Sequence, residues 1–471
     1  MYFLLPFKFR AIGENEILVN EPGDFLIVPR GTAKRIVERK IKEEDALYKD
    51  LVAGWFISDK LIPDLVDNFA VRLRTKKAFL DDFTALHIFV VTLRCNQNCI
   101  YCQASSRPSD ALQCDMQQSD LISAINLMMQ SPAQSITMEF QGGEPTLVPE
   151  LLEDAIIWTE QINEKAHKNI TYVICSNCIE IPAELLDFCK KYNVYFSVSF
   201  DGPPLLHNHN RGKKDSFEKF QCGLNKVRNA LGNDHISALM TTSEESLKYP
   251  EEIIESYLSM GFNHIFLRPL NPYGAAFKTI SWDTYSRKFL SFFKKSVLYI
   301  IEKNLSGTYF VEDFSTIILR KILTPFSDGF VDMQSPAGII NGVIVYNYDG
   351  YVYASDESRM LAEDGDFSFR LGAITSEYQG LFYGEKAQKL SEIWCAECIA
   401  GCSDCAYQQY CGADPVRNHT AQHDAYGFRP SSNLCSLHMK IIDFIFELII
   451  TRKNEILPIF QSWIINTGGR R

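Results

Sequence analysis

The chain has 471 residues, of which 46% are hydrophobic and 22% are charged, and its formal net charge is −11 at pH 7. These values are ordinary for a globular protein of two or three domains, and they argue against a general nucleic-acid-binding protein, which carries a basic stripe. No apolar run approaches the roughly 20 residues that a membrane-spanning helix needs, so we expect no membrane segment.

Residues 1–78 are expected to form a separate N-terminal unit. The first ten residues break at Pro6 and lack a long apolar core, which argues against a signal peptide. Short strands followed by helices are predicted at Tyr2–Arg10, Glu16–Asn20, Phe25–Val28, Thr32–Arg39 and Asp45–Gly54. The segment Ala46–Ser58 is a helix leading into a wing-like strand, and the unit resembles the small winged-helix modules that bind leader peptides. Such modules can add a peptide strand to a sheet edge; a plain N-terminal cap is the alternative.

Residues 79–304 alternate between strand-like and helical segments. Strands are predicted at Thr84–Arg94, Ser135–Phe140, Ile170–Ser176, Val194–Phe200, Ile236–Thr242 and His264–Leu270. Helices are predicted at Ser119–Gln130, Pro149–Ala166, Pro182–Tyr192, Ser216–Leu231 and Tyr249–Met260. Six alternating units indicate an α/β fold with a parallel sheet and right-handed crossovers, and they fall short of a closed eight-fold barrel.

Three closely spaced cysteines, Cys95, Cys99 and Cys102, directly follow the first predicted strand. Three thiolates on one loop can hold an iron–sulfur cluster, and because a cubane cluster has four irons, one iron keeps an open position. An open position distinguishes a reactive metal site from a structural one. The alternatives are a structural metal knuckle and three unrelated core cysteines. Fourteen cysteines without an export signal indicate metal or redox use in a reducing cytoplasm.

A second motif, Gln141-Gly142-Gly143-Glu144-Pro145, follows the second predicted strand. The glycines let the backbone approach a ligand closely, and Glu144 supplies a carboxylate that accepts from an amine. Together with the cysteine loop, the motif resembles the radical S-adenosylmethionine (SAM) enzymes, whose usual fold is a partial (β/α)6 barrel. The resemblance implies that Tyr101 lies against the adenine and that the Gly-Gly-Glu-Pro turn holds the methionyl amino group. It also implies that SAM chelates the open iron of a 4Fe–4S cluster and is cleaved to a 5′-deoxyadenosyl radical, which abstracts a hydrogen atom.

The same resemblance places further residues near SAM. Ser199 and Arg211 would contact SAM, the arginine through the SAM carboxylate, which suits a guanidinium fork. Asn177, at the end of the third predicted strand, would lie near the methionine moiety. Asp356 aligns with the aspartate that sulfatase maturases use as a proton acceptor, and an ordinary surface aspartate is the alternative.

The chain beyond the predicted barrel is expected to contain fewer regular elements. A long helix is predicted at Ser281–Asn304, irregular structure at 305–335, and a β-hairpin at Ile339–Ala354 that turns at Asp349-Gly350. We assign 305–385 to a bridging region, 386–452 to a cysteine-rich domain that ends in a helix at 435–452, and 453–471 to a polar C-terminal tail.

Six cysteines lie in the cysteine-rich region, at Cys395, Cys398, Cys402, Cys405, Cys411 and Cys435. Their spacing alone leaves zinc and iron–sulfur binding open. A hairpin followed by this pattern resembles the SPASM extension of radical SAM peptide maturases, which binds auxiliary clusters. The resemblance implies an auxiliary 4Fe–4S cluster on the last four of these cysteines.

The inner auxiliary cluster of the SPASM pattern lacks its usual cysteines in this chain. Ser335, Ser355 and Asp414 stand near the expected cysteine positions, and their oxygens are poor substitutes for thiolates on iron. Either the inner cluster is absent, or Cys395 and Cys398 form a second auxiliary site in a new arrangement.

Longer stretches resemble the B component of the His-Xaa-Ser maturation systems. They are Phe83–Cys95, Met240–Thr242, Ile265–Pro269 and Cys405–Pro415. The resemblance implies oxidative modification of a ribosomally made precursor peptide with His-Xaa-Ser repeats, with cross-linking of its side chains favoured. It implies a second radical SAM maturase and a flavodoxin- or ferredoxin-type reductant as partners. A formylglycine-forming sulfatase maturase and a non-catalytic iron–sulfur or zinc scaffold that recruits the precursor are the alternatives.

Overall fold

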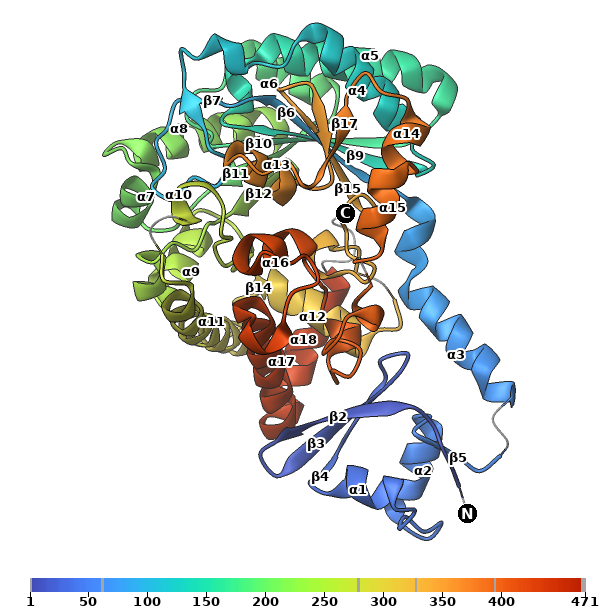
Figure 1. Cartoon of the computed structure of the whole chain (residues 1–471). Helices are drawn as coiled ribbons and strands as arrows, with labels where there is room; N and C mark the ends of the chain where they lie inside the picture. Colours follow the sequence, from blue (N-terminus) through green and yellow to red (C-terminus); the bar gives the residue numbers. More distant parts are fainter. Residues whose placement is uncertain (1, 61–62, 278–279, 327, 394, 467–471) are drawn as a thin grey trace.

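The structure is a computed structural model that describes residues 2–60, 63–277, 280–326, 328–393 and 395–466. An α/β body contains the cysteine loop, a mostly helical region contains the second cysteine set, and a small N-terminal sheet packs beneath that region (Figure 1). Among the described helices, none combines the length and apolarity required to cross a bilayer.

The α/β body is built on one eight-stranded sheet with the order β12-β11-β10-β9-β6-β15-β16-β17. The strands are β6 Leu86–Thr92, β9 Ser135–Gly142, β10 Asn169–Ser176, β11 Tyr195–Ser199, β12 Ile236–Leu239, β15 Val343–Asn347, β16 Tyr351–Tyr353 and β17 Arg370–Ala373. Pairing is parallel from β12 to β15 and antiparallel from β15 to β17.

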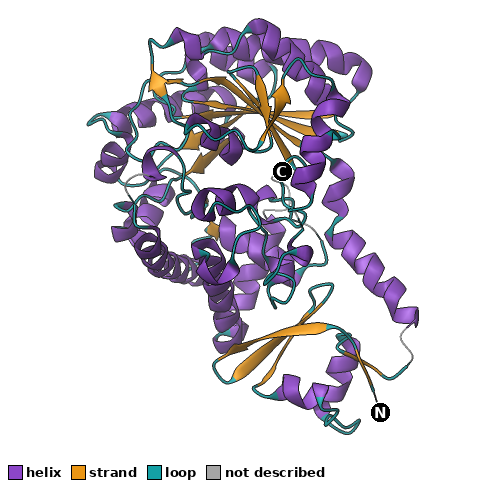
Figure 2. Cartoon of the chain, in the orientation of Figure 1, coloured by secondary structure: helices purple, strands orange, loops and turns teal. Residues whose placement is uncertain are grey.

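Helices cover the outer face of this sheet (Figure 2). They are α4 Gln118–Met129, α5 Pro149–Ala166, α6 Ala183–Lys191, α7 Pro204–Arg211, α8 Ser216–Leu231 and α9 Pro250–Ser259. Side chains alternate along β9: Ile136, Met138 and Phe140 are buried in the main core, whereas Glu139 belongs to the other face and is only half-buried. The face of the sheet under the helices is thus apolar, and the opposite, inner face carries polar side chains that can take part in binding or catalysis.

The sixth predicted strand, His264–Leu270, is not part of the main sheet, so that prediction was wrong. Only β13 His264–Ile265 is a strand, and it pairs with β14 Val311–Glu312. The Leu267 N–H donates to the Glu312 carboxylate at 3.1 Å, and the Leu270 N–H donates to the Tyr285 hydroxyl at 2.9 Å. Because side chains take these backbone donors, contact with the end of β12 is reduced to one isolated bridge.

The predicted hairpin forms, but it extends the main sheet because β15 pairs in parallel with β6. The expectation of irregular structure at 305–335 was wrong, since α12 Asp313–Leu323 begins there with Glu312 as its N-cap. The expected polar tail at 453–471 was also wrong within the described residues. Helix α18, Lys453–Asn466, buries Ile456, Phe460 and Trp463; Pro458 within it obscured the helical pattern.

The N-terminal unit contains a three-stranded antiparallel meander, a strand pair and helices. These elements are β2 Phe7–Ile12, β3 Asn15–Asn20, β4 Phe25–Pro29, β1 Phe3–Leu4 paired with β5 Ile57–Ser58, α1 Thr32–Val37 and α2 Ala46–Ala53. Helix α3, Pro63–Lys76, then runs toward the α/β body (Figure 1).

The remaining helices surround the second cysteine set or join it to the sheet. They are α10 Gly274–Phe277, α11 Trp282–Leu305, α13 Asp356–Glu363, α14 Tyr378–Phe382, α15 Glu385–Ser391, α16 Pro415–Gln422 and α17 Asn433–Thr451. The meander contacts this region through Arg10, which pairs with Asp443 at 2.7 Å, and through Phe25, whose ring packs edge-on against Phe446.

Candidate functional site

The first cysteine loop leaves the carboxyl end of β6 and is held there by Arg94 and Asp115. Cys95 itself ends the short strand β7 Arg94–Cys95, which pairs with β8 Arg107–Pro108. The Arg94 guanidinium donates from Nε and Nη2 to the two Asp115 oxygens, both at 2.7 Å, and the Thr92 hydroxyl donates to Asp115 at 2.6 Å. This bidentate pair fixes the backbone that enters the loop.

The three thiols of this loop are near neighbours, and hydrogen-bond donors reach their sulfurs. Gln97 N–H lies 3.4 Å and Asn177 Nδ2 lies 3.8 Å from Cys95 Sγ, while the Cys102 sulfur lies 3.3 Å from the Ser106 hydroxyl. Burial, with the Glu144 carboxylate nearby, raises the pKa of the Cys95 thiol to about 12, so an iron site must displace its proton. Free thiols with donors to sulfur suit a cluster ligand set.

Within the described residues, no three His, Cys, Asp or Glu side chains surround a position for a single metal ion. An iron–sulfur cluster does not need that geometry, because each of its thiolates binds a different iron. The loop therefore fits a cluster as a donor set.

The two glycines of the second motif are required by backbone contact with the cysteine loop. A Cβ on Gly142 would lie 2.0 Å from the Thr92 carbonyl oxygen, and one on Gly143 would lie 2.3 Å from the Arg94 carbonyl oxygen. The amides of Gly143 and Glu144 donate to those same carbonyls, at 2.9 and 2.7 Å. The end of β9 thus packs directly on the backbone that carries Cys95.

Glu144 is fully buried and accepts four hydrogen bonds from the chain. Its Oε1 accepts from Thr146 N, Thr146 Oγ1 and Ser176 Oγ, and its Oε2 accepts from Asn177 N at 2.7 Å. Sequence reasoning gave this carboxylate to a ligand amine, and the structure shows that it also joins the ends of β9 and β10. Asn177, oriented in this way, donates to Asn96 Oδ1 at 2.7 Å and toward Cys95.

Tyr101 and Arg211 meet at a buried aspartate that sequence reasoning did not single out. Asp201 accepts from Tyr101 Oη at 2.7 Å and from Arg211 Nε and Nη2 at 2.8 and 3.0 Å. The guanidinium lies 5.5 Å from the centre of the Tyr101 ring. Ser199 ends β11 next to this group and is half-buried. Nothing local in the sequence pairs Asp201 with Tyr101, because the two residues lie a hundred positions apart.

Asp356 belongs to a charged group inside the α/β body, where it begins α13. It accepts from Arg359 Nη2 at 2.7 Å, and the Arg359 side chain is completely buried. Its neighbour Glu357 is paired with Arg268 Nη2 at 3.2 Å, and Arg268 also donates to Asp332. Burial and the adjacent Asp332 raise the pKa of Glu357 to about 8.

Two interior residues, Glu139 and Cys175, received no site role from the sequence, and Cys175 was interpreted as structural. Glu139 on β9 and Cys175 on β10 are hydrogen-bonded to one another, and both feel the charge of Asp356. Burial raises the pKa of each group, most strongly that of the Cys175 thiol. The available signal was the Glu139 carboxylate itself, between the apolar Met138 and Phe140, because a carboxylate is rarely buried without a partner.

The second cysteine set divides into a group of four and a pair. The pKa of Cys411 is raised to about 12 by burial and by the nearby thiols of Cys402, Cys405 and Cys435. Cys395 and Cys398 influence one another and lie on either side of Glu397. The thiols of Cys402, Cys405, Cys411 and Cys435 are therefore near enough to influence one another, and Cys395 lies near Cys398.

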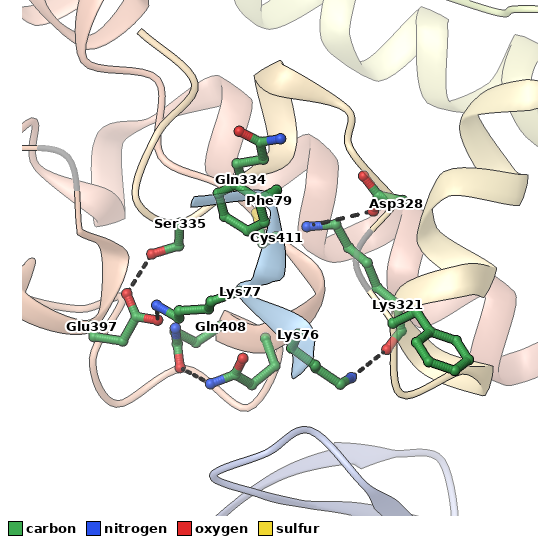
Figure 3. A pocket seen from close by; sticks show the side chains of 12 residues that line it. Lys76, Lys77, Phe79, Lys321, Asp328, Gln334, Ser335, Glu397, Gln408 and Cys411 are labelled. Carbon is green, nitrogen blue, oxygen red and sulfur yellow. Dashed lines mark hydrogen bonds and ion pairs between the residues drawn. The ribbon is translucent and has the colours of Figure 1, made fainter. Parts of the chain in front are cut away.

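Ser335, Ser355 and Asp414, at the missing cysteine positions, make structural hydrogen bonds. Ser355 and Asp414 are the N-caps of α13 and α16. Ser335 accepts from the Ala396 amide at 3.0 Å and donates to Glu397, which pairs with Lys77 beside a cavity that Cys411 also lines (Figure 3). None of these side chains supplies a thiolate, so the usual inner-cluster ligand set does not fit.

Comparison with known proteins identifies the α/β body. Residues 89–257 match the family profile of the Radical SAM superfamily. This part of the chain is similar to a radical SAM domain. The match supports an enzyme that uses SAM and a 4Fe–4S cluster, and six further cysteines lie in the C-terminal region.

Curated relatives share only part of their length with this chain. The protein MJ0907 of Methanocaldococcus jannaschii is 27% identical over 39% of this chain and 62% of its own length. The radical SAM cyclopropyl synthase TigE of Paramaledivibacter caminithermalis is 23% identical over 49% of this chain and 50% of its own length. A cysteine-type anaerobic sulfatase-maturating enzyme of Clostridium novyi is 27% identical over 30% of this chain and 38% of its own length.

Solved structures share the fold over most of the chain. The structure of anSMEcpe with bound AdoMet superposes with a TM-score of 0.65 at 18% identity, covering 82% of this chain and 99% of that one. Streptococcus suis SuiB bound to its precursor peptide SuiA gives a TM-score of 0.52 at 13% identity, covering 92% of this chain and 99% of that one. At these identities the likeness establishes the fold alone.

Proposed function

We propose that the protein is a radical SAM maturase that oxidatively modifies side chains of a ribosomally made precursor peptide. The observation that carries the proposal is the position of the cysteine loop. It lies at the carboxyl end of a parallel sheet whose interior holds Asp356, Glu357, Glu139 and Cys175. A bound cluster and SAM would supply a carbon-centred radical at the mouth of this polar interior.

We assign roles to the chain's own residues as follows. Cys95, Cys99 and Cys102 hold the SAM cluster, and Gly142, Gly143 and Glu144 shape the place for the SAM methionine. Tyr101, Asn177, Ser199 and Arg211 line the remaining SAM site. Asp356 accepts the proton that the oxidised substrate releases, since its carboxylate faces the interior and is held by Arg359.

For the C-terminal region we propose one auxiliary 4Fe–4S cluster on Cys402, Cys405, Cys411 and Cys435. Cys395 and Cys398 remain the candidate for a second site. The N-terminal unit, 1–78, would bind the leader of a precursor with His-Xaa-Ser repeats, with a second radical SAM maturase and a flavodoxin- or ferredoxin-type reductant as partners in the cytoplasm. The solved structure of SuiB, which is bound to the precursor peptide SuiA, supports a peptide substrate.

The proposal is tested by anoxic reconstitution and by co-expression with the precursor. Reduced protein should form 5′-deoxyadenosine from SAM, and the precursor should lose two hydrogens if a cross-link forms. The variant C99A should abolish 5′-deoxyadenosine formation, whereas C405A should retain it while losing iron and product. An unmodified precursor in the presence of active SAM cleavage would contradict the peptide-modifying role.

A formylglycine-forming sulfatase maturase is the second candidate. The anSMEcpe structures with peptides bound and the Clostridium novyi relative favour it. An aldehyde on the product, captured by a hydrazide probe, separates this reaction from cross-linking. The Radical SAM match of residues 89–257 favours an enzyme over the non-catalytic scaffold.

A further inference from the structure

The sulfur of Cys99 has a charged neighbour. Arg211 Nη1 lies 3.9 Å from Cys99 Sγ, whereas the donors that reach Cys95 and Cys102 from side chains are the neutral Asn177 and Ser106. Among the described hydrogen bonds to these three sulfurs, that of Arg211 alone comes from a cationic side chain. Hydrogen bonds to the sulfurs and the local net charge are two of the factors that set a cluster's reduction potential.

Asp201 fixes the position of Arg211. The Asp201 carboxylate accepts from Nε and Nη2 of the guanidinium in a bidentate pair. The Asp201 side chain is 0% exposed and the Arg211 side chain is 7% exposed. Tyr101 Oη and Thr241 N–H complete the hydrogen bonds to Asp201. Because Asp201 holds Nε and Nη2 of the Arg211 guanidinium, the remaining nitrogen, Nη1, points toward the Cys99 sulfur.

Backbone contacts lock the end of α7 to the cysteine loop. The Ile100 N–H donates to the Asn210 carbonyl at 3.0 Å. Gly212, at a φ of 72°, follows Arg211 and approaches so closely that an added Cβ would lie 2.2 Å from the Asn98 carbonyl oxygen. The approach of Arg211 to Cys99 is therefore built into two backbones and does not depend on a mobile surface side chain.

We propose that Arg211 is a positioning residue that sets the reduction potential of the cluster on Cys95, Cys99 and Cys102, with Asp201 holding it against the Cys99 sulfur. The inference rests on the cluster assignment in the proposed function and goes beyond the SAM-carboxylate contact expected of Arg211. It applies to the cluster before SAM binds and needs no peptide substrate.

The charges predict opposite effects for the two partners. Reduction adds an electron to the cluster, and a donor cation at a ligand sulfur stabilises the reduced form, so removing Arg211 should lower the potential. Asp201 carries the opposite charge, and its field also reaches the Cys99 sulfur. An asparagine at this position keeps an amide oxygen that accepts from the guanidinium but removes the negative charge, so the potential should rise.

An anoxic redox titration of the SAM-free, reconstituted full-length protein tests this, with the reduced cluster followed by electron paramagnetic resonance. At the wild-type midpoint, R211Q should lower the ratio of reduced to oxidised cluster about tenfold, which corresponds to 59 mV for a one-electron couple. D201N should raise that ratio. R211K, which keeps the charge but loses the fork, should fall between R211Q and wild type.

S106A is the matched control, because it removes a neutral donor from Cys102 and should shift the potential less than R211Q. A normally loaded R211Q cluster with an unchanged midpoint would overturn the proposal. If R211Q does not bind a cluster, the midpoint potentials of R211K and D201N are compared instead. Shifts of the same sign in these two variants would overturn the proposal. If even the wild type binds no cluster, the assignment of the three cysteines has failed instead. Weaker SAM binding in R211Q with an unchanged SAM-free midpoint would assign Arg211 to the SAM carboxylate alone.

Discussion

At the scale of single residues, carboxylates organise the site by accepting hydrogen bonds from the chain. Glu144 joins two strand ends, Asp201 holds an arginine beside a cysteine, and Asp115 holds the arginine that precedes Cys95. At each of these positions, one negatively charged carboxylate accepts hydrogen bonds from two or more groups of the chain. Substitution by the corresponding amide keeps the shape and removes the charge.

Replacing Glu144 by glutamine should therefore loosen the junction of β9 and β10. The amide nitrogen would face N–H or O–H donors that now bind oxygen, so E144Q should lower the free energy of unfolding by about 3 kcal/mol. SAM affinity should fall with it, because Asn177 loses its anchor. Anoxic urea unfolding and equilibrium dialysis measure both effects. E150Q, an exposed change at the start of α5, serves as the control; equal effects in the two variants would contradict the role of Glu144.

Glu357 should make stability depend on pH. Its pKa is about 8 in the folded protein and near the ordinary 4.5 in the unfolded chain, so only the folded state holds the proton between these values. Stability should then fall as the pH rises from about 5 to about 8, by roughly 3–4 kcal/mol. E357Q has no proton to lose and should show a flatter profile in urea unfolding. Parallel profiles for the two proteins would show that Glu357 contributes nothing to this dependence.

At the scale of elements, periodic segments were predictable and segments shaped by distant partners were not. The first five strands of the sheet lie where runs with apolar residues at alternate positions placed them, because such runs bury one face against the covering helices. His264–Leu270 is also largely apolar, but it contains Pro269, and Glu312 and Tyr285 accept hydrogen bonds from its backbone donors. Those acceptors come from α11 and the start of α12, which no local pattern connects to this segment.

The candidate site divides in the same way. Cys95, Cys99, Cys102 and the two glycines stand at fixed spacings on short loops, so the sequence predicted where each motif begins and ends. The partners of Tyr101 and Arg211 required the fold, since Asp201 is brought to them by β11 and α7. The spacing of the motif residues predicts which side chains belong to the site. Their hydrogen-bond partners depend on the packing of distant segments.

Helix α18, which the sequence analysis assigned to a polar tail, can be tested for its contribution to stability. Trp463 is fully buried on α18, a helix that contacts α11, α12 and α17, whereas Ile465, two residues later, is 75% exposed. W463A should lower the free energy of unfolding by about 3–5 kcal/mol through the cavity it leaves, and I465A should change it by less than about 1 kcal/mol. Thermal or urea unfolding distinguishes them. Equal, small effects would mean that residues 453–466 behave as the tail first expected.

At the scale of the molecule, the N-terminal unit and the second cysteine set share contacts. Asp443 on α17 accepts from Arg10 of β2 at 2.7 Å and from the Tyr407 hydroxyl at 2.7 Å. The Tyr407 amide in turn donates to Cys405 Sγ at 3.4 Å. Three regions far apart in the sequence thus meet at one carboxylate, so a peptide held by the N-terminal unit would be placed relative to the auxiliary cysteines.

Replacing Asp443 by asparagine should separate binding from radical formation. The Arg10 side chain is partly exposed, which screens the ion pair, so D443N should cost only about 1–2 kcal/mol of unfolding free energy. Precursor affinity and product yield should fall, while 5′-deoxyadenosine formation in the absence of precursor should stay at the wild-type rate, because no contact of Asp443 reaches the α/β body in the described structure. E447Q, one turn along the same helix face and half-exposed, is the control and should leave all three measurements unchanged. Loss of SAM cleavage in D443N would instead mean that the N-terminal unit and the first cysteine loop are coupled through the whole molecule.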